Sequence, residues 1–239
     1  MTEIGVITYG HFDGLEEGIK KLKTCFGNAR ISVLNNMPNA ARPSEIQGSY
    51  AHYEFSGYLE MCESFTGTGP FVIVNDTLFK THYTVGWLRL LKRAMIQLNK
   101  DTVTVYGDIR WDGNAYAERP NPFLASWLFV LPNAYSLDVF KQSLTEILNE
   151  PTSLGSEAYQ AFLHAWIFPK GKLSGWHGGA KDEHARIRKE RCIRLEHRLS
   201  TVLPQHGLPL TSLGSFSPFF YMILRGMDRL NTRVKAWLT

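Results

Sequence analysis

Residues 70–79 read PFVIVNDTLF, and this stretch decides the expected fold. Its first half, which ends at Val74, is apolar or β-branched, as in a central strand that is covered on both faces. Asn75 and Asp76 would then emerge at the carboxyl edge of a sheet, where open α/β folds bind their ligands. A carboxylate there is costly unless something binds it, so Asp76 is a candidate for chemistry. The alternative is that both residues only turn the chain or cap the next helix.

Outward from this stretch, hydrophobic periodicity predicts alternating strands and helices. Further strands are expected over residues 4–9, 31–34, 102–106 and 123–131. Helices are expected over residues 15–24 with Asp13 as cap, 53–61, 87–98, 137–148, 154–168 with a start near Ser156, 183–203 and 218–238 with Ser217 as cap. The first strand, helix and second strand have the spacing of a parallel β-α-β unit. The predicted fold class is therefore α/β, with a mostly parallel central sheet that is flanked by helices.

Polar residues end the first two strands as well. Thr8-Tyr9 and Asn35-Asn36 would lie side by side at the rim where a nucleotide commonly binds. No glycine-rich phosphate-binding sequence follows the first strand, so a dinucleotide-binding fold or a P-loop finds no support. The polar, turn-rich segment 107–122 is predicted to be a loop over the acceptor side of a site.

The composition is that of a water-soluble globular protein, with 44% hydrophobic and 20% charged residues among 239. Its cysteines, Cys25, Cys62 and Cys192, are widely spaced, which fits a reducing compartment and offers no metal cluster. No basic segment with an apolar core precedes Gly10, and no apolar run has the length of a membrane span. We therefore expect a cytoplasmic protein.

After Lys170 the chain becomes richer in glycine and basic residues. Trp176 and His177 belong to a glycine-rich loop, where His177 either contacts a diphosphate or is simply solvated. In the helix expected over 183–203, Glu196 lies at the edge between the apolar stripe and the solvent. The stripe consists of Cys192, Leu195, Leu199 and Val202, and the surrounding basic residues are Arg186, Arg188, Lys189, Arg191, Arg194 and Arg198.

The segment 215–239 is predicted to be a basic amphipathic helix beyond a domain formed by residues 1–214. Its expected apolar face consists of Phe219, Ile223, Met227, Leu230, Val234 and Leu238. Such a helix can lie on anionic lipid at the inner face of the cell membrane. A solvated helix, or a homodimer contact through the apolar side, is the alternative. Aromatic residues are not interleaved with the basic charge of 181–198, so nucleic-acid binding is not indicated.

Several short motifs follow one another along the chain. They are ITY at 7–9, LEEG at 15–18, ISVLNN at 31–36, EFSG at 54–57, VND at 74–76, LASWLFVL at 124–131 and Glu196-His197. In this order they resemble GT-A-fold nucleotide-sugar glycosyltransferases, and 124–131 is similar to the acceptor-side strand of polysaccharide-assembly members, including the rhamnan-synthesis group. The resemblance covers residues 4–210. It implies a GT-A-like, Rossmann-like sheet and a hexosyltransferase-type enzyme of surface polysaccharide synthesis.

The resemblance also implies roles for particular residues. The implied donor site consists of Thr8, Tyr9, Asn36, Glu54, Asn75 and Asp76. Asp76 would hold Mg²⁺ or Mn²⁺ at the diphosphate of the nucleotide-sugar donor. Glu196 would act as the base that takes a proton from a glycan or lipid-linked acceptor, with inversion at the sugar.

Two departures from the family pattern leave alternatives open. The segment Asn75-Asp76-Thr77 has one carboxylate where the family's DxD has two, and His197 stands where a second carboxylate would follow Glu196. Asp76 could be a turn residue, Glu196 a partner in a surface ion pair, and Thr8 and Tyr9 ordinary strand-end residues. The competing function is a non-catalytic GT-A-like binding or scaffold subunit.

Overall fold

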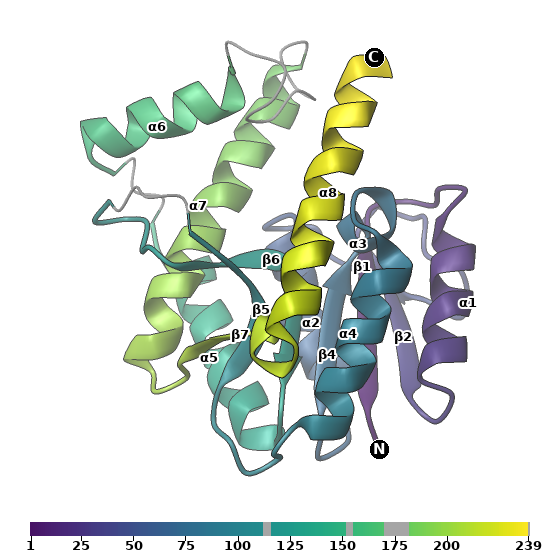
Figure 1. The fold of residues 1–239 in the computed structure, drawn as a ribbon. Helices are drawn as coiled ribbons and strands as arrows, with labels where there is room; N and C mark the ends of the chain where they lie inside the picture. Colours follow the sequence, from purple (N-terminus) through teal and green to yellow (C-terminus); the bar gives the residue numbers. More distant parts are fainter. Residues whose placement is uncertain (112–115, 152–154, 170–181, 239) are drawn as a thin grey trace.

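The computed structural model describes residues 1–111, 116–151, 155–169 and 182–238, with side chains of the last helix as far as Asn231. The strands are β1 (Glu3–Thr8), β2 (Arg30–Asn35), β3 (Ile46–Gln47), β4 (Phe71–Asn75), β5 (Val105–Arg110), β6 (Phe123–Leu131) and β7 (Leu210–Ser212). The helices are α1 (Leu15–Cys25), α2 (Glu54–Ser64), α3 (Thr77–Lys80), α4 (Thr84–Gln97), α5 (Ala134–Asn149), α6 (Glu157–Ile167), α7 (Glu183–Gln205), the short 3₁₀ helix η1 (Leu213–Phe216) and α8 (Pro218–Leu238). Figure 1 shows their arrangement.

One seven-stranded sheet organises the described residues, in the order β3-β2-β1-β4-β6-β5-β7. β1 pairs in parallel with β2 and with β4, β2 with β3, and β5 with β7. Strand β6 runs antiparallel to both of its neighbours, β4 and β5. The predicted α/β class with a mostly parallel sheet is therefore confirmed.

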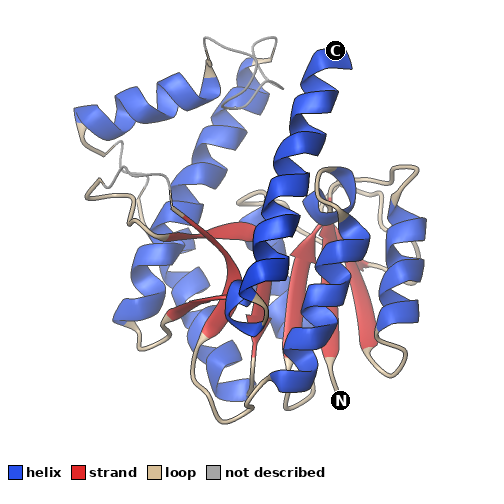
Figure 2. Cartoon of the chain, viewed as in Figure 1, coloured by secondary structure: helices blue, strands red, loops and turns tan. Residues whose placement is uncertain are grey.

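Within residues 70–79, Phe71–Asn75 forms the central strand β4, whose five residues are all buried, and α3 begins at Thr77. Phe71 and Ile73 pack in a core with α2, α5 and α7, whereas Val72 and Val74 pack in the opposite core with α1, α3, α4 and α8. Helices therefore cover both faces of the sheet (Figure 2). This double cover is the reason why the strand is continuously apolar rather than alternating.

Several element boundaries differ from the prediction. Asp13 does not cap α1, because Gly14 holds the cap position without a side-chain hydrogen bond. β5 begins at Val105, not at residue 102, and extends to Arg110, because residues 106–110 pair with β6 across a register shift. The short edge strands β3 and β7 were not predicted, since two or three residues carry no periodicity. Ser156 caps α6 as expected.

Helix α8 packs through a face other than the predicted one. Leu224 is fully buried and Asp228 is 8% exposed, whereas Phe219 is 71% and Leu230 61% exposed. The physical reason is that Asp228 is held by polar groups at the start of α4, which turns the expected apolar face outward. Among the helices of the described residues, none has the length and apolar character needed to cross a lipid bilayer.

Candidate active site

The carboxyl ends of β1, β2 and β4 meet at one edge of the sheet, at the point where the chain order reverses between β1 and β4. A cavity of about 390 Å³ lies there, which we call the switch-point cavity. Its lining includes all of the residues predicted for the donor site, which are Thr8, Tyr9, Asn36, Glu54, Asn75 and Asp76. Residues 185–192 of α7 close its other side. Reversal points of this kind are where open α/β sheets bind ligands.

Asp76 lies between the ends of β1 and β4. Its Oδ2 atom lies 2.6 Å from Lys80 Nζ, and it accepts hydrogen bonds of 3.3 Å from Thr8 Oγ1 and from the Tyr9 backbone N–H. The side chain of Asp76 does not cap α3. Asn75 does so instead, because its Oδ1 accepts from the Thr77 N–H at 3.0 Å. Asp76 therefore occupies the predicted cap position of α3 without a side-chain cap bond, and the hydrogen bond to the first turn comes from Asn75.

Asn36 is a buried polar residue in the lining of the switch-point cavity. Its Nδ2 donates to the Tyr53 carbonyl at 3.2 Å, while its Oδ1 has no hydrogen-bond partner among the described residues. A buried acceptor without a partner costs about 1–3 kcal/mol. A bound ligand with an N–H or O–H group could satisfy this atom.

Three tyrosines form one wall of the switch-point cavity. The rings of Tyr9 and Tyr50 lie 4.8 Å apart, and those of Tyr50 and Tyr53 lie 5.3 Å apart edge to face. Tyr50 and Tyr53 have φ angles of 57° and 58°, a conformation that bulky residues rarely adopt. Strain of about 1–3 kcal/mol per residue is typical of ligand clamps. The wall is therefore suited to the flat face of a ring such as a nucleobase.

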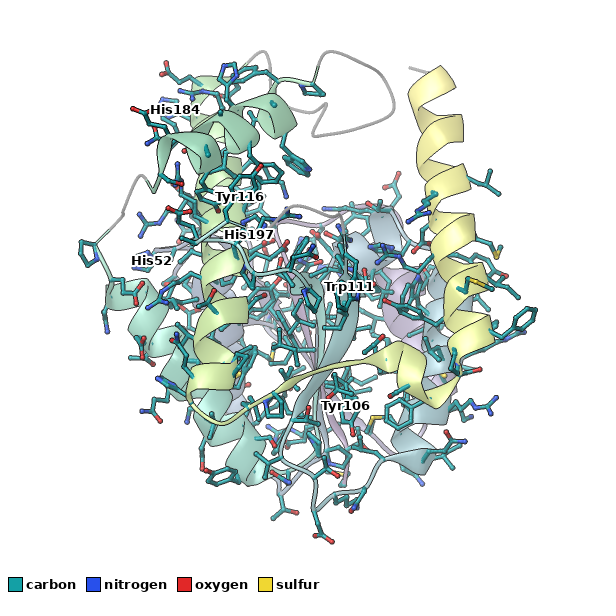
Figure 3. All side chains as sticks on the ribbon, turned by 60° about the vertical axis from the view of Figure 1, so that its left-hand side comes forward. His52, Tyr106, Trp111, Tyr116, His184 and His197 are labelled. Atoms are coloured by element: carbon teal, nitrogen blue, oxygen red, sulfur yellow. The ribbon has the colours of Figure 1, made fainter. Side chains whose placement is uncertain are left out.

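A second cavity, of about 360 Å³, adjoins the first, and we call it the Glu196 cavity. It lies beside β6 and between α7 and α8, and Figure 3 shows Trp111 and His197 in this region. The residues that line both cavities are Glu54, Asn75, Lys189 and Cys192. The two cavities are therefore neighbouring compartments with a common boundary.

Glu196 is held in place by Ser126 of β6. Its Oε2 accepts from the Ser126 backbone N–H at 2.9 Å and from Ser126 Oγ at 2.5 Å. Ion pairs with the neighbouring arginines do not fix the position of Glu196, since Arg194 pairs with Glu190 and Arg198 pairs with Glu150. The carboxylate faces the Glu196 cavity, as a proton acceptor would need to.

Glu54 is the second carboxyl group at Ser126. Its Oε1 lies 3.4 Å from Ser126 Oγ, and its Oε2 accepts from Asn75 Nδ2 at 3.3 Å. Burial, with repulsion by Glu196 and Asp76, raises the pKa of Glu54 to about 7, although Lys189 acts in the opposite direction. The Ser126 hydroxyl has one proton, which it donates to Glu196 across the shorter of the two contacts. The hydroxyl oxygen can therefore accept a hydrogen bond from Glu54 when Glu54 is protonated.

A cationic network closes the Glu196 cavity from the side of α8. Asp108 accepts from Arg225, from Tyr221 Oη at 2.7 Å and from Trp127 Nε1 at 3.1 Å, and it pairs with Arg110 at 3.3 Å. Burial raises the pKa of Asp108, but the two arginines outweigh it and hold the pKa below its usual value. Asp108 therefore fixes Arg110 and Arg225, which both line the cavity.

His197, next to Glu196, has a structural environment. Its Nδ1 lies 2.7 Å from Tyr159 Oη, and its ring packs edge to face on Phe123. Burial, with repulsion by Arg119 and Arg194, lowers the pKa of His197 to about 3. A neutral histidine does not replace the second carboxylate of the family pattern. The predicted loop residues Trp176 and His177 lie outside the described residues.

The residues at Asp76 are a poor fit for a divalent cation. The described residues contain no cluster of three or more His, Cys, Asp or Glu side chains that could hold a metal ion. The single carboxylate of Asp76 already receives the Lys80 ammonium, whose charge would repel a metal ion beside Oδ2. The Mg²⁺ or Mn²⁺ site stays a prediction.

Sequence reasoning missed several residues of the two cavities. Tyr50 lies just before the helix predicted over residues 53–61 and Tyr53 at its predicted start, and two tyrosines three residues apart beside the predicted rim were a usable signal. Ser126 is a single hydroxyl within the apolar strand β6, and such an interruption marks a polar partner. Arg188 and Lys189 carried no signal, because exposed and site-lining cations look alike in a basic helix.

Comparison of the chain with protein-family models, with curated proteins and with solved structures finds no match.

Proposed function

We propose that this chain is a glycosyltransferase with a GT-A-like fold, which moves a sugar from a nucleotide-sugar donor to a hydroxyl group of a glycan or lipid-linked acceptor. The observation that carries the proposal is the pair of adjoining cavities. One lies at the reversal point of the sheet with a tyrosine wall and an unsatisfied buried amide, and the other presents a fixed carboxylate. A two-substrate transfer needs this layout, because donor and acceptor must meet at one boundary.

In the proposed reaction the nucleotide occupies the switch-point cavity. Its base packs on the tyrosine wall, and an N–H or O–H group donates to Asn36 Oδ1. Thr8 and Asp76, at the ends of β1 and β4, face the ribose or the phosphates. The sugar then lies at the boundary formed by Glu54, Asn75, Lys189 and Cys192.

Glu196 is the proposed base. It receives the proton of the acceptor hydroxyl while the hydroxyl oxygen attacks the anomeric carbon from the side opposite to the leaving group. A single displacement of this kind inverts the configuration at that carbon. Ser126 holds the Glu196 carboxylate through two hydrogen bonds, and this orientation is what general-base catalysis requires.

The surface of α8 supports an acceptor at a membrane. Phe219, Met222 and Leu230 are 71%, 62% and 61% exposed, and Arg229, which is exposed and also borders the Glu196 cavity, lies next to Leu230. We propose that this face of α8 lies on anionic lipid at the inner face of the cell membrane, since apolar and cationic residues together favour such a surface.

The proposal is tested by nucleoside diphosphate release with a panel of uridine, guanosine and thymidine diphosphate sugars and candidate glycan acceptors. We expect turnover with at least one donor, and we expect Glu196→Gln to lower kcat by about 10²–10⁴-fold with unchanged nucleotide binding. The matched control is Glu183→Gln on the exposed start of the same helix, which should retain activity. Equal turnover of Glu196→Gln and the native protein would contradict the assigned base.

The competing function is a non-catalytic GT-A-like binding subunit, and the Lys80 ammonium on Asp76 favours it. Such a protein would bind a nucleoside diphosphate without turning over any donor. In that case Glu196→Gln would leave the amount of cell-surface polysaccharide unchanged.

A further inference from the structure

The cations on α7 suggest how the leaving group is stabilised. Lys189 lies on the common boundary of the two cavities, and its neighbour Arg188 lines only the switch-point cavity. Both residues are of intermediate exposure, and they lie on the part of α7 that lines the same cavity as the carboxyl ends of β1 and β4. Within the described part of the chain, Lys189 is the cation that faces both compartments.

The contacts of these two cations leave them able to bind an anion. Lys189 Nζ lies 5.7 Å from the centroid of the Trp166 ring, and its charge lowers the pKa of the neighbouring Glu54. Arg188 Nη2 lies 3.8 Å from Asp182 Oδ2, and the side chains of Arg188 and Asp182 are 38% and 55% exposed. Exposed ion pairs contribute little to stability, so an incoming phosphate group can compete with Asp182 for Arg188.

The carboxylates near Lys189 do not form a metal site in its place. Asp76 is paired with Lys80, and Glu54 is bonded to Asn75 and Ser126. Glu196 is bonded to Ser126 on the far side of the boundary. A diphosphate in the switch-point cavity would therefore meet ammonium and guanidinium groups at the position where its charge increases.

We infer that the Lys189 ammonium, with Arg188 beside it, binds the diphosphate of the donor and takes the place of a divalent cation held by Asp76. The inference rests on the proposed glycosyl transfer. In that step the acceptor oxygen forms a bond to the anomeric carbon while the bond from this carbon to the phosphate oxygen breaks. The hydroxyl proton passes to Glu196, and the electron pair of the broken bond stays on the phosphate oxygen. Lys189 stabilises the negative charge that develops there.

The test is calorimetric binding of uridine, guanosine and thymidine diphosphates to the full chain, in EDTA and again in Mn²⁺. We expect at least one diphosphate to bind with a similar Kd in both buffers. Lys189→Met should weaken this binding at least tenfold in EDTA, Mn²⁺ should not restore it, and Lys189→Arg should retain most of it. Arg186→Met is the matched control, because Arg186 lies on the same helix and lines neither cavity.

The outcomes separate the inference from the proposed function. Binding that requires Mn²⁺, is lost in Asp76→Asn and is unchanged in Lys189→Met would overturn the inference and leave the glycosyltransferase proposal standing. No binding of any diphosphate in either buffer would reject the proposed function together with the inference. Thermal unfolding of each variant verifies that the substituted protein is folded.

Discussion

Ser126 links the two carboxyl groups of the candidate site, although it is a single hydroxyl in an otherwise apolar, fully buried strand. It donates to Glu196, and it lies within 3.4 Å of Glu54. Two carboxyl groups at one hydroxyl cannot both be charged without repulsion, so one of them retains a proton near neutral pH. The raised pKa of Glu54, about 7, identifies this residue as the one that does so.

The protonation of Glu54 predicts a pH-dependent stability. The folded protein keeps this proton up to about pH 7, whereas the unfolded chain loses it near the ordinary value of 4.5. The free energy of unfolding should therefore decrease as the pH rises through this window, by up to about 3 kcal/mol from this group. Glu54→Gln, which cannot lose a proton, should lack this decrease. Urea unfolding of both proteins at intervals of pH measures it.

A matched substitution separates this effect from other titrations. Glu60→Gln lies on the same helix, where Glu60 accepts from Ser49 at the surface, and it should follow the pH dependence of the native protein. His197, whose pKa is lowered to about 3, acts in the opposite direction below its ordinary value of 6.5 and is common to all three proteins. A difference between Glu54→Gln and the native protein that stays constant with pH would contradict the assignment.

Helix α8 is attached to the sheet domain by a buried polar anchor. Asp228 accepts from His82 Nδ1 at 2.7 Å, from the Tyr83 N–H at 2.8 Å and from Trp87 Nε1 at 2.8 Å. Leu224 beside it is fully buried. This helix carries Tyr221 and Arg225 to Asp108 at the edge of the Glu196 cavity, so the anchor also positions part of the candidate site.

Removal of the anchor should destabilise the protein. Asp228→Ala leaves buried donors on α4 and on the loop before it without their acceptor, which we expect to cost about 2–4 kcal/mol. Asp138→Ala, at an exposed position of α5, should cost little. The midpoints of urea unfolding compare the two variants. Equal midpoints would show that Asp228 does not hold α8.

The outward face of α8 makes a prediction about membranes. The native protein should sediment with phosphatidylglycerol vesicles and not with phosphatidylcholine vesicles, because anionic lipid complements Arg229. Met222→Glu and Leu230→Glu should each reduce the bound fraction several-fold. Ile96→Glu is the control, since Ile96 is 77% exposed on α4.

Other partners of this face would give a different result. If α8 were a homodimer contact, sedimentation velocity would show a dimer that Met222→Glu dissociates, and neither kind of vesicle would bind the native protein. A solvated helix would show neither effect. Either outcome would contradict a lipid surface.

At the scale of the whole molecule, local pattern was enough to predict the sheet and the edge that carries the cavities. Residues 71–74 are wholly apolar, and residues 123–131 are apolar except for Ser126, because helices cover both faces, and such runs are readable in a sequence. The rim residues Thr8, Asn36 and Asp76 could be predicted because parallel strands bring their carboxyl ends to one edge.

The rest depended on long-range contacts that local pattern does not contain. The face of α8 was predicted wrongly, because one buried carboxylate, Asp228, decided its orientation against an apolar stripe. Likewise, the meeting of Glu54 and Glu196 at Ser126 joins α2, α7 and β6, and each of the two carboxyl groups is 70 or more residues away from Ser126 in the sequence. Whether the domain ends at residue 214 stays a prediction.

We propose that the switch-point cavity binds the nucleotide of a sugar donor with its diphosphate directed at the boundary to the Glu196 cavity. A crystal structure of the protein soaked with a nucleoside diphosphate would show where the nucleotide binds. We predict a base on the wall formed by Tyr9, Tyr50 and Tyr53, with the diphosphate within ion-pair distance of Lys189. A nucleotide bound elsewhere on the molecule, or an empty switch-point cavity in saturated crystals, would contradict the claim.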